Sequence, residues 1–66
     1  MKIIATGEER EVPESTTVAS LIHELGILKA ACAAEVNRSL VPKRDHERTE
    51  LREGDRIELV TLVGGG

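Results

Sequence analysis

The chain has 66 residues and no Phe, Tyr or Trp, and its 9 basic and 12 acidic side chains give a formal net charge of -3. An acidic chain without aromatic side chains lacks attraction to phosphates and surfaces for base stacking, so nucleic acid is excluded as an expected partner. A single domain this small leaves little room for a catalytic cleft, which favours a carrier or a binding module over an enzyme.

Cysteine usage and hydropathy set further limits. Cys32 is the only cysteine, so no disulfide forms within the chain, and no Cys and His residues lie at zinc-ligand spacing. We find neither the pattern of a signal peptide nor an apolar run of membrane-spanning length. The sequence therefore predicts a cytoplasmic protein with no membrane partner.

The first predicted element is a β-hairpin. Residues 1–6 are rich in β-branched side chains, Gly7 lies in a turn signal, and residues 10–13 read as the returning strand. Because side chains alternate along a strand, Ile3 is expected to face the core and Ile4 the opposite face.

A short amphipathic helix is expected next. Thr17 is a suitable N-cap, since its hydroxyl accepts a hydrogen bond from a first-turn N–H. Apolar residues then recur at the spacing of one helix face, at Val18, Leu21, Ile22 and Leu25. Gly26 is placed to end the helix. A helix this short depends on packing against a sheet for its stability.

More strands are expected in the second half of the chain. Residues 33–37 and 39–42 read as short strands joined by a turn, in which Asn37 tolerates the left-handed conformation. Residues 43–50 are charged and non-periodic, which indicates a solvated loop with a short helical turn. A tight turn at residues 53–55 then begins the last strand.

This order of elements predicts an α+β fold of the β-grasp (ubiquitin-like) type. The sheet is mixed, has four to five strands and carries one main helix across one face; its last strand, residues 56–63, pairs in parallel with the first at the sheet centre. We expect a domain at residues 1–63 and a flexible glycine tail at residues 64–66. We also expect a monomer when the protein is free.

The chain ends on Gly64, Gly65 and Gly66, directly after that central strand. Glycines pass through a channel too narrow for residues with a Cβ, and these end in a carboxylate. The sequence therefore predicts that the reactive group is the terminal carboxylate of Gly66, presented by Gly64 and Gly65. The alternative is a frayed tail without function.

Four segments carry a family resemblance. They are Thr17-Val18 at the helix start, residues 35–43 with the pattern Val-Asn-x-x-x-Val-Pro, residues 53–58 with Gly-Asp, and residues 63–66 at the glycine end. In this combination the chain resembles, over essentially its whole length, the ubiquitin-like sulfur carriers and most closely the ThiS family of thiamin biosynthesis.

The resemblance implies a covalent sulfur carrier that binds no cofactor itself. An E1-like adenylyltransferase of the ThiF type would use ATP and magnesium to adenylate the Gly66 carboxylate. A persulfide from a cysteine desulfurase or another donor would then yield a thiocarboxylate, and a thiazole synthase of the ThiG type would take up the sulfur. Carriers for molybdopterin, cysteine or transfer-RNA thiolation, a non-covalent interaction domain and a protein modifier stay open as alternatives.

A docking surface for these partners is expected on the sheet face opposite the helix. The alternation of strand residues places Ile4, Val60 and Leu62 on that face, and Val63 continues toward the tail. Ordinary half-buried strand residues are the alternative interpretation.

Three other side chains attract functional interpretations. Cys32 suggests redox chemistry, but its alternation with the strand residues after it favours a small buried hydrophobe. His23 is expected to face solvent on the helix, and His46 lies in the charged loop. Neither histidine has a partner at metal-ligand spacing, so no metal site is predicted.

Overall fold

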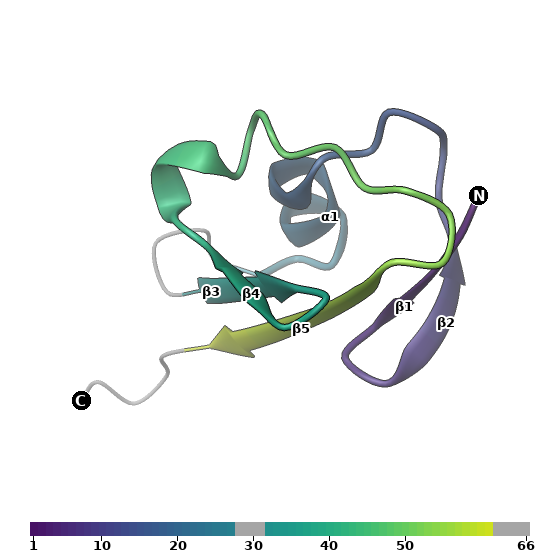
Figure 1. Cartoon of the computed structure of the whole chain (residues 1–66), viewed down its shortest axis with the longest axis horizontal. Helices are drawn as coiled ribbons and strands as arrows, with labels where there is room; N and C mark the ends of the chain where they lie inside the picture. The colour runs from purple at the N-terminus through teal and green to yellow at the C-terminus, as the bar shows by residue number, and fades with distance from the viewer. Residues whose placement is uncertain (28–31, 62–66) are drawn as a thin grey trace.

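The computed structural model describes residues 1–27 and 32–61, which have the predicted β-grasp arrangement (Figure 1). They form one mixed sheet in the order β2-β1-β5-β3-β4, and the helix lies across one face of it. The elements in chain order are β1 (Lys2–Ala5), β2 (Glu8–Glu11), α1 (Val18–Glu24), β3 (Cys32–Val36), β4 (Ser39–Val41), the 3-10 helix η2 (Lys43–Asp45) and β5 (Arg56–Thr61). The predicted order of elements is confirmed.

The last strand, β5, lies at the centre of the sheet, as predicted. It pairs in parallel with β1, where Ile4 is opposite Arg56, and antiparallel with β3, where Cys32 is opposite Thr61. Residues 62 and 63, which the sequence assigns to this strand, lie outside the described residues. The tail at residues 64–66 does too, so the boundary between domain and tail stays a prediction.

The core lies between the sheet and α1 and consists of aliphatic side chains and one cysteine. Strand alternation brings Ile3 and Ile57 to the face that α1 covers, and both are fully buried. The cluster comprises Ile3, Ala5, Val12, Val18, Leu21, Ile22, Cys32, Ala34, Leu51, Ile57 and Leu59. Ile4 is half-buried, which agrees with its predicted place on the other face.

Helix α1 begins and ends where the sequence predicts. Thr17 and Ser20 form a capping box, in which the Ser20 N–H donates to Thr17 Oγ1 at 3.1 Å and the Thr17 N–H donates to Ser20 Oγ at 2.8 Å. At the other end, Gly26 has a φ of 74° and its N–H donates to the His23 carbonyl at 3.0 Å. Local hydrogen bonds therefore fix both ends of a helix that is too short to be stable alone.

Two motifs of the sequence meet at the β3–β4 turn. Asn37 and Arg38 form this turn with φ values of 51° and 72°. The side-chain amide of Asn37 donates to Asp55 Oδ1 at 3.0 Å, and its carbonyl oxygen accepts from the Arg56 N–H at 3.0 Å. Asp55 Oδ2 also accepts from the Arg52 N–H at 2.8 Å. The Val-Asn and Gly-Asp motifs thus lock the start of β5 against the turn.

We expect Asn37→Ala and Asp55→Ala each to lower the free energy of unfolding by about 0.5–1.5 kcal/mol, because each removes exposed hydrogen bonds whose remaining groups water can solvate. The two losses should fall short of additivity by about 0.5 kcal/mol or more, because the variants remove the same hydrogen bond. Urea denaturation of both single variants and the double variant measures this coupling. Fully additive losses would show that the two side chains act independently.

One part of the predicted charged loop is wrong. Arg44, Glu47 and Arg48 are exposed as expected, but His46 is fully buried. Its Nε2 lies 3.1 Å from the Val41 carbonyl oxygen, and its own carbonyl accepts a hydrogen bond from the Ala19 N–H at 3.0 Å. The turn of η2 carries His46 inward, where it connects the end of β4 to the first turn of α1.

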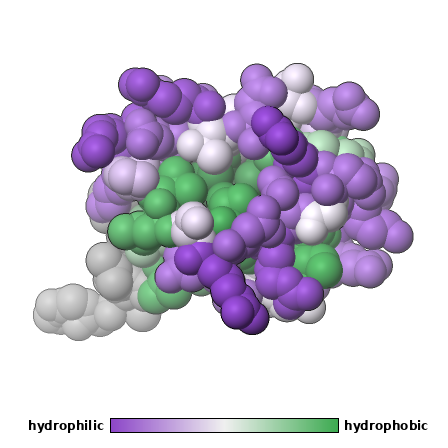
Figure 2. Space-filling model, viewed as in Figure 1, coloured by the Kyte–Doolittle hydropathy of each residue, from purple (hydrophilic) through white to green (hydrophobic). Residues whose placement is uncertain are grey.

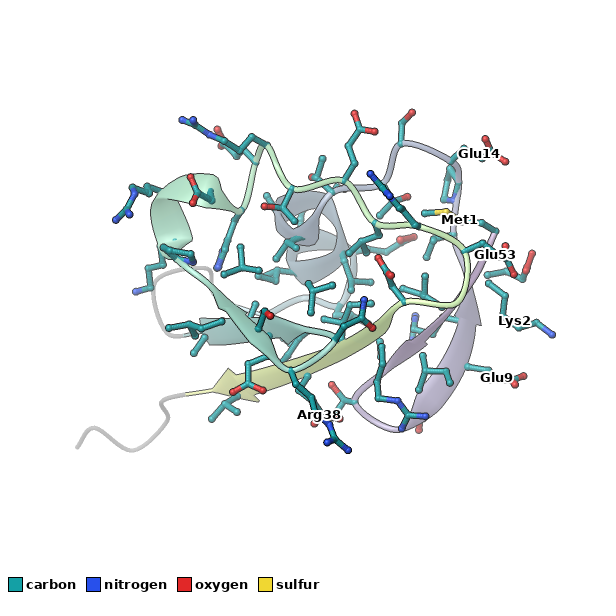
Figure 3. The ribbon with its side chains drawn as sticks, viewed as in Figure 1. Met1, Lys2, Glu9, Glu14, Arg38 and Glu53 are labelled. Carbon is teal, nitrogen blue, oxygen red and sulfur yellow. The ribbon has the colours of Figure 1, made fainter. Side chains whose placement is uncertain are left out.

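The hairpin edge of the sheet is charged (Figure 3). Every residue of β2 is Glu or Arg. Lys2 Nζ lies 4.0 Å from Glu9 Oε1, and the Lys2 N–H donates to Glu53 Oε1 at 3.0 Å. A short, charged edge strand disfavours pairing with the edge of another chain.

Candidate functional site

The predicted reactive end follows the central strand. Gly64, Gly65 and Gly66, together with Leu62 and Val63, lie outside the described residues, so their roles stay predictions. The structure does place the strand that leads to them: Thr61, the last residue of β5, is still paired with Cys32 of β3. On the other side of β5, β1 pairs only as far as Ile57, so β3 alone holds the described end of β5 in place.

The outer face, which we define as the sheet face opposite α1, carries part of the predicted docking surface. Val60 is 56% exposed there, while Ile57 and Leu59 of the same strand are buried on the α1 side. This alternation agrees with the prediction from the sequence. Val60 is therefore an apolar side chain available to a partner close to the end of the chain.

Ile4 does not lie next to Val60 on the outer face. The parallel register sets Ile4 opposite Arg56, which is roughly 13 Å from Val60 along β5 at the usual rise per residue. The side chains between them on this face are the exposed Arg56 and Glu58. The expected continuous strip is thus interrupted by charge, because the sequence does not reveal the register between the first and last strands.

Leu40 is an outer-face residue that the sequence interpretation missed. It is 67% exposed and lies opposite Glu35 across the β3–β4 pair, while Ala33 is opposite Val60 across the β3–β5 pair. We name Ala33, Leu40 and Val60 the apolar patch. Figure 2 shows apolar side chains gathered over the region of β3, β4 and the end of β5, with polar ones around them. The alternation of side chains along the predicted strand at residues 39–42 is the sequence signal that would have identified Leu40 as an outer-face residue.

Cys32 is fully buried, as predicted. Burial raises the pKa of its thiol, and the positive charge of Lys43 offsets part of that increase. Because the thiolate is the nucleophile, a buried thiol with a raised pKa is a poor one. Cys32 therefore serves the core in this structure.

Two measurements check this account of Cys32. Native protein should react with iodoacetamide at neutral pH at least about tenfold more slowly than urea-unfolded protein, because the thiol is buried and protonated.

As pH rises above the ordinary thiol pKa, the Cys32 thiol loses its proton in the unfolded chain before it does so in the folded protein, so the free energy of unfolding should fall. This loss of unfolding free energy should be smaller in Cys32→Ala than in the wild type. Equal losses in the two proteins would contradict the raised pKa.

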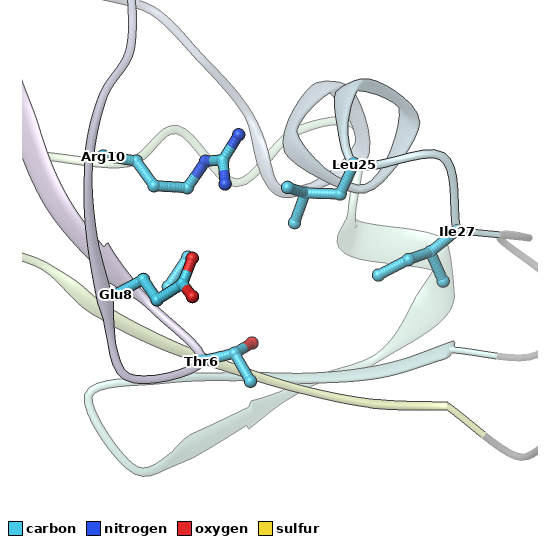
Figure 4. A pocket seen from close by; sticks show the side chains of 6 residues that line it. Thr6, Glu8, Arg10, Leu25 and Ile27 are labelled. Atoms are coloured by element: carbon cyan, nitrogen blue, oxygen red, sulfur yellow. The ribbon is translucent and has the colours of Figure 1, made fainter.

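A groove of about 310 Å³ lies between the hairpin and the end of α1 (Figure 4). It is lined by Ala5, Thr6, Glu8, Arg10, Leu25 and Ile27. Glu8 and Arg10 reach from β2 toward Leu25 and Ile27 across it. No pattern in the sequence predicts this groove, and the described residues that line it include no cysteine, histidine or lysine to act as a nucleophile or base.

Residues 1–27 and 32–61 contain neither a metal site nor a membrane-spanning helix. Within these ranges no three His, Cys, Asp or Glu side chains come together as a metal site would require. The helical segments of the same ranges are too short and too polar to cross a membrane.

Comparison with solved structures identifies a close neighbour. A crystal structure of a thiamine biosynthesis protein (ThiS) from Geobacter metallireducens superimposes with a TM-score of 0.82 at 26% identity, and the match covers 100% of both chains. The likeness therefore extends over the whole β-grasp arrangement.

Curated sequences give a second comparison. A thiazole synthase from Paramagnetospirillum magneticum is 39% identical over 66 residues, which are 100% of this chain but 20% of that protein. The chain thus spans about a fifth of the length of that relative. An uncharacterized protein, ycf40, of Porphyra purpurea is 30% identical over 100% of this chain and 93% of its own length. The model of the ThiS family matches residues 2–66, so the chain belongs to the ThiS family.

Proposed function

We propose that this protein is a sulfur carrier, and that its reactive group is the terminal carboxylate of Gly66. The observation that carries the proposal is the match to the ThiS family, which extends through the closing glycines at residues 64–66. The central position of β5 supports it, because a rigid strand leading to residues without side chains suits delivery of a carboxylate into a narrow site. The chain itself is a substrate of its partners and catalyses no step.

The chemistry follows from the poor reactivity of a carboxylate toward nucleophiles. A ThiF-type adenylyltransferase, with ATP and magnesium, joins the carboxylate to the α-phosphate and releases pyrophosphate. The outer sulfur of a persulfide, supplied through a cysteine desulfurase or another donor, attacks the acyl carbon and displaces AMP. A thiol then attacks the donor-side sulfur of the acyl disulfide, which releases the thiocarboxylate and leaves a disulfide between thiol and donor.

The residues of this chain contribute reach and docking. Gly64 and Gly65 let the backbone approach the bound nucleotide without a side-chain collision, and the partner binds this backbone as an added strand. The apolar patch of Ala33, Leu40 and Val60 provides the docking surface, together with Leu62 and Val63, which follow it in the sequence. Holding the carboxylate close to the α-phosphate makes the reaction effectively intramolecular.

Thiazole synthase of the ThiG type is the proposed sulfur acceptor. The relative from Paramagnetospirillum magneticum bears the name thiazole synthase, and a segment like this chain occupies 20% of it. A carrier-like segment within a synthase polypeptide supports a functional connection between the two. This observation favours thiazole formation over molybdopterin synthesis, cysteine synthesis or transfer-RNA thiolation.

The choice of acceptor is tested with protein that already carries the thiocarboxylate. It is offered separately to a thiazole synthase, a molybdopterin synthase large subunit and a transfer-RNA thiolase, each with its other substrates. We expect the sulfur to leave the carrier only with thiazole synthase and to appear in the thiazole product. If the carrier kept its sulfur in the presence of thiazole synthase but released it to one of the other two enzymes, that enzyme would be the acceptor.

A further inference from the structure

Two carboxylates face each other beside the apolar patch. Glu35 of β3 and Glu58 of β5 are direct partners in the antiparallel register, and both are exposed on the outer face. Residues directly opposite in such a pair have Cβ atoms about 4.5–5.5 Å apart, and like charges at this distance destabilise a sheet. The pair therefore destabilises the fold, so stability does not explain why two carboxylates lie opposite each other here.

No side chain in the described part of the chain forms an ion pair with either carboxylate. Neither carboxylate takes part in an ion pair or side-chain hydrogen bond there, although the exposed Arg56 lies on the same face. Arg38, at the nearby β3–β4 turn, is also exposed (Figure 3). Two accessible negative charges are thus left unpaired in the middle of the sheet.

The surroundings of the pair have the composition of a protein interface. Leu40 is opposite Glu35 on β4, and Ala33 and Val60 form the adjacent row on β3 and β5. Leu40 and Val60 are 67% and 56% exposed. Apolar contacts exclude water around a charged pair, and a partly desolvated pair contributes more to affinity than an exposed one.

We propose that Glu35 and Glu58 together bind an arginine of the adenylating partner, whose guanidinium lies between the carboxylates while neighbouring apolar side chains cover Leu40 and Val60. This inference rests on the proposed function for the identity of the partner. A guanidinium suits the pair better than an ammonium, because its planar set of five donors serves two carboxylates at once. It also removes the repulsion that the free carrier retains.

The test compares the wild type with the double variant Glu35→Gln/Glu58→Gln. The control, Glu11→Gln/Glu14→Gln, changes the net charge equally through two exposed residues of the hairpin region. Calorimetry measures the Kd of each for the ThiF-type enzyme without ATP, and ATP–pyrophosphate exchange measures KM and kcat. We expect Kd and KM to rise about tenfold or more in the outer-face variant, with kcat unchanged, and to stay near wild type in the control.

Salt dependence and stability separate recognition from a structural role. The Kd of the wild type should rise with added salt, and the Kd of Glu35→Gln/Glu58→Gln should rise less. Its melting temperature should equal or exceed that of the wild type, since the variant relieves repulsion. The inference would be overturned if Glu35→Gln/Glu58→Gln bound the enzyme with the wild-type Kd, or if the control variant lost as much affinity. Wild-type protein that binds but supports no exchange would instead refute the proposed function, and the Kd values would still decide the role of the pair.

Discussion

We expect removal of Gly66 to slow loading with sulfur severely while leaving the fold intact. The shortened protein still ends in a glycine carboxylate, that of Gly65, so its intrinsic chemistry is unchanged. Its reach is shorter by about 3.5 Å, the span of one extended residue. Misplacement of reacting atoms by about 1 Å can cost about a hundredfold in rate, so we expect at least that loss.

The measurement is the rate at which the thiocarboxylate appears by mass spectrometry, with ATP, the ThiF-type enzyme and a sulfur donor present. The melting temperature serves as the control and should not change, because every residue of the described core precedes residue 60. A truncated protein that is loaded at the wild-type rate would show that Gly66 is not the reactive residue.

We expect replacement of Ile57 by Ala to remove most of the free energy of unfolding of the protein. Ile57 is fully buried on the central strand β5, where it belongs to the core cluster. Truncation of a buried isoleucine costs about 2–5 kcal/mol through lost transfer energy and an unfilled cavity. A core of this size rarely supplies more than about 3–5 kcal/mol of net stability, so the loss consumes most of it.

Val60→Ala is the matched control for this variant, because it shortens an exposed side chain on the same strand. Its cost should stay within about 0.5 kcal/mol, as for most surface substitutions. Circular dichroism in urea gives both values. An Ile57→Ala protein that is as stable as Val60→Ala would contradict the assignment of the core.

The sequence predicted best those features whose signals are local. Thr17 and Gly26 mark the ends of α1 through bonds to residues within one turn, so reading the chain in order was enough. The alternation that buries Ile57 and exposes Val60 is likewise a property of a single strand. The β-grasp topology followed from the order of such elements.

Features that depend on register or on the path of a loop were not predictable in the same way. The position of Ile4 opposite Arg56 separates it from Val60, and no local pattern encodes that offset. The burial of His46 depends on how η2 turns against α1 and β4. The Glu35 and Glu58 pair likewise exists only because two distant segments align.

Intact mass spectrometry of the wild-type protein tests the central claim most directly. The protein is incubated with ATP, magnesium, the ThiF-type enzyme and a persulfide donor, and a reaction without ATP is the control. We predict an ATP-dependent mass increase that matches exchange of one oxygen for sulfur, and fragmentation that places it at Gly66. An unchanged mass, or sulfur found on Cys32 instead, would contradict a carrier that works through its terminal carboxylate.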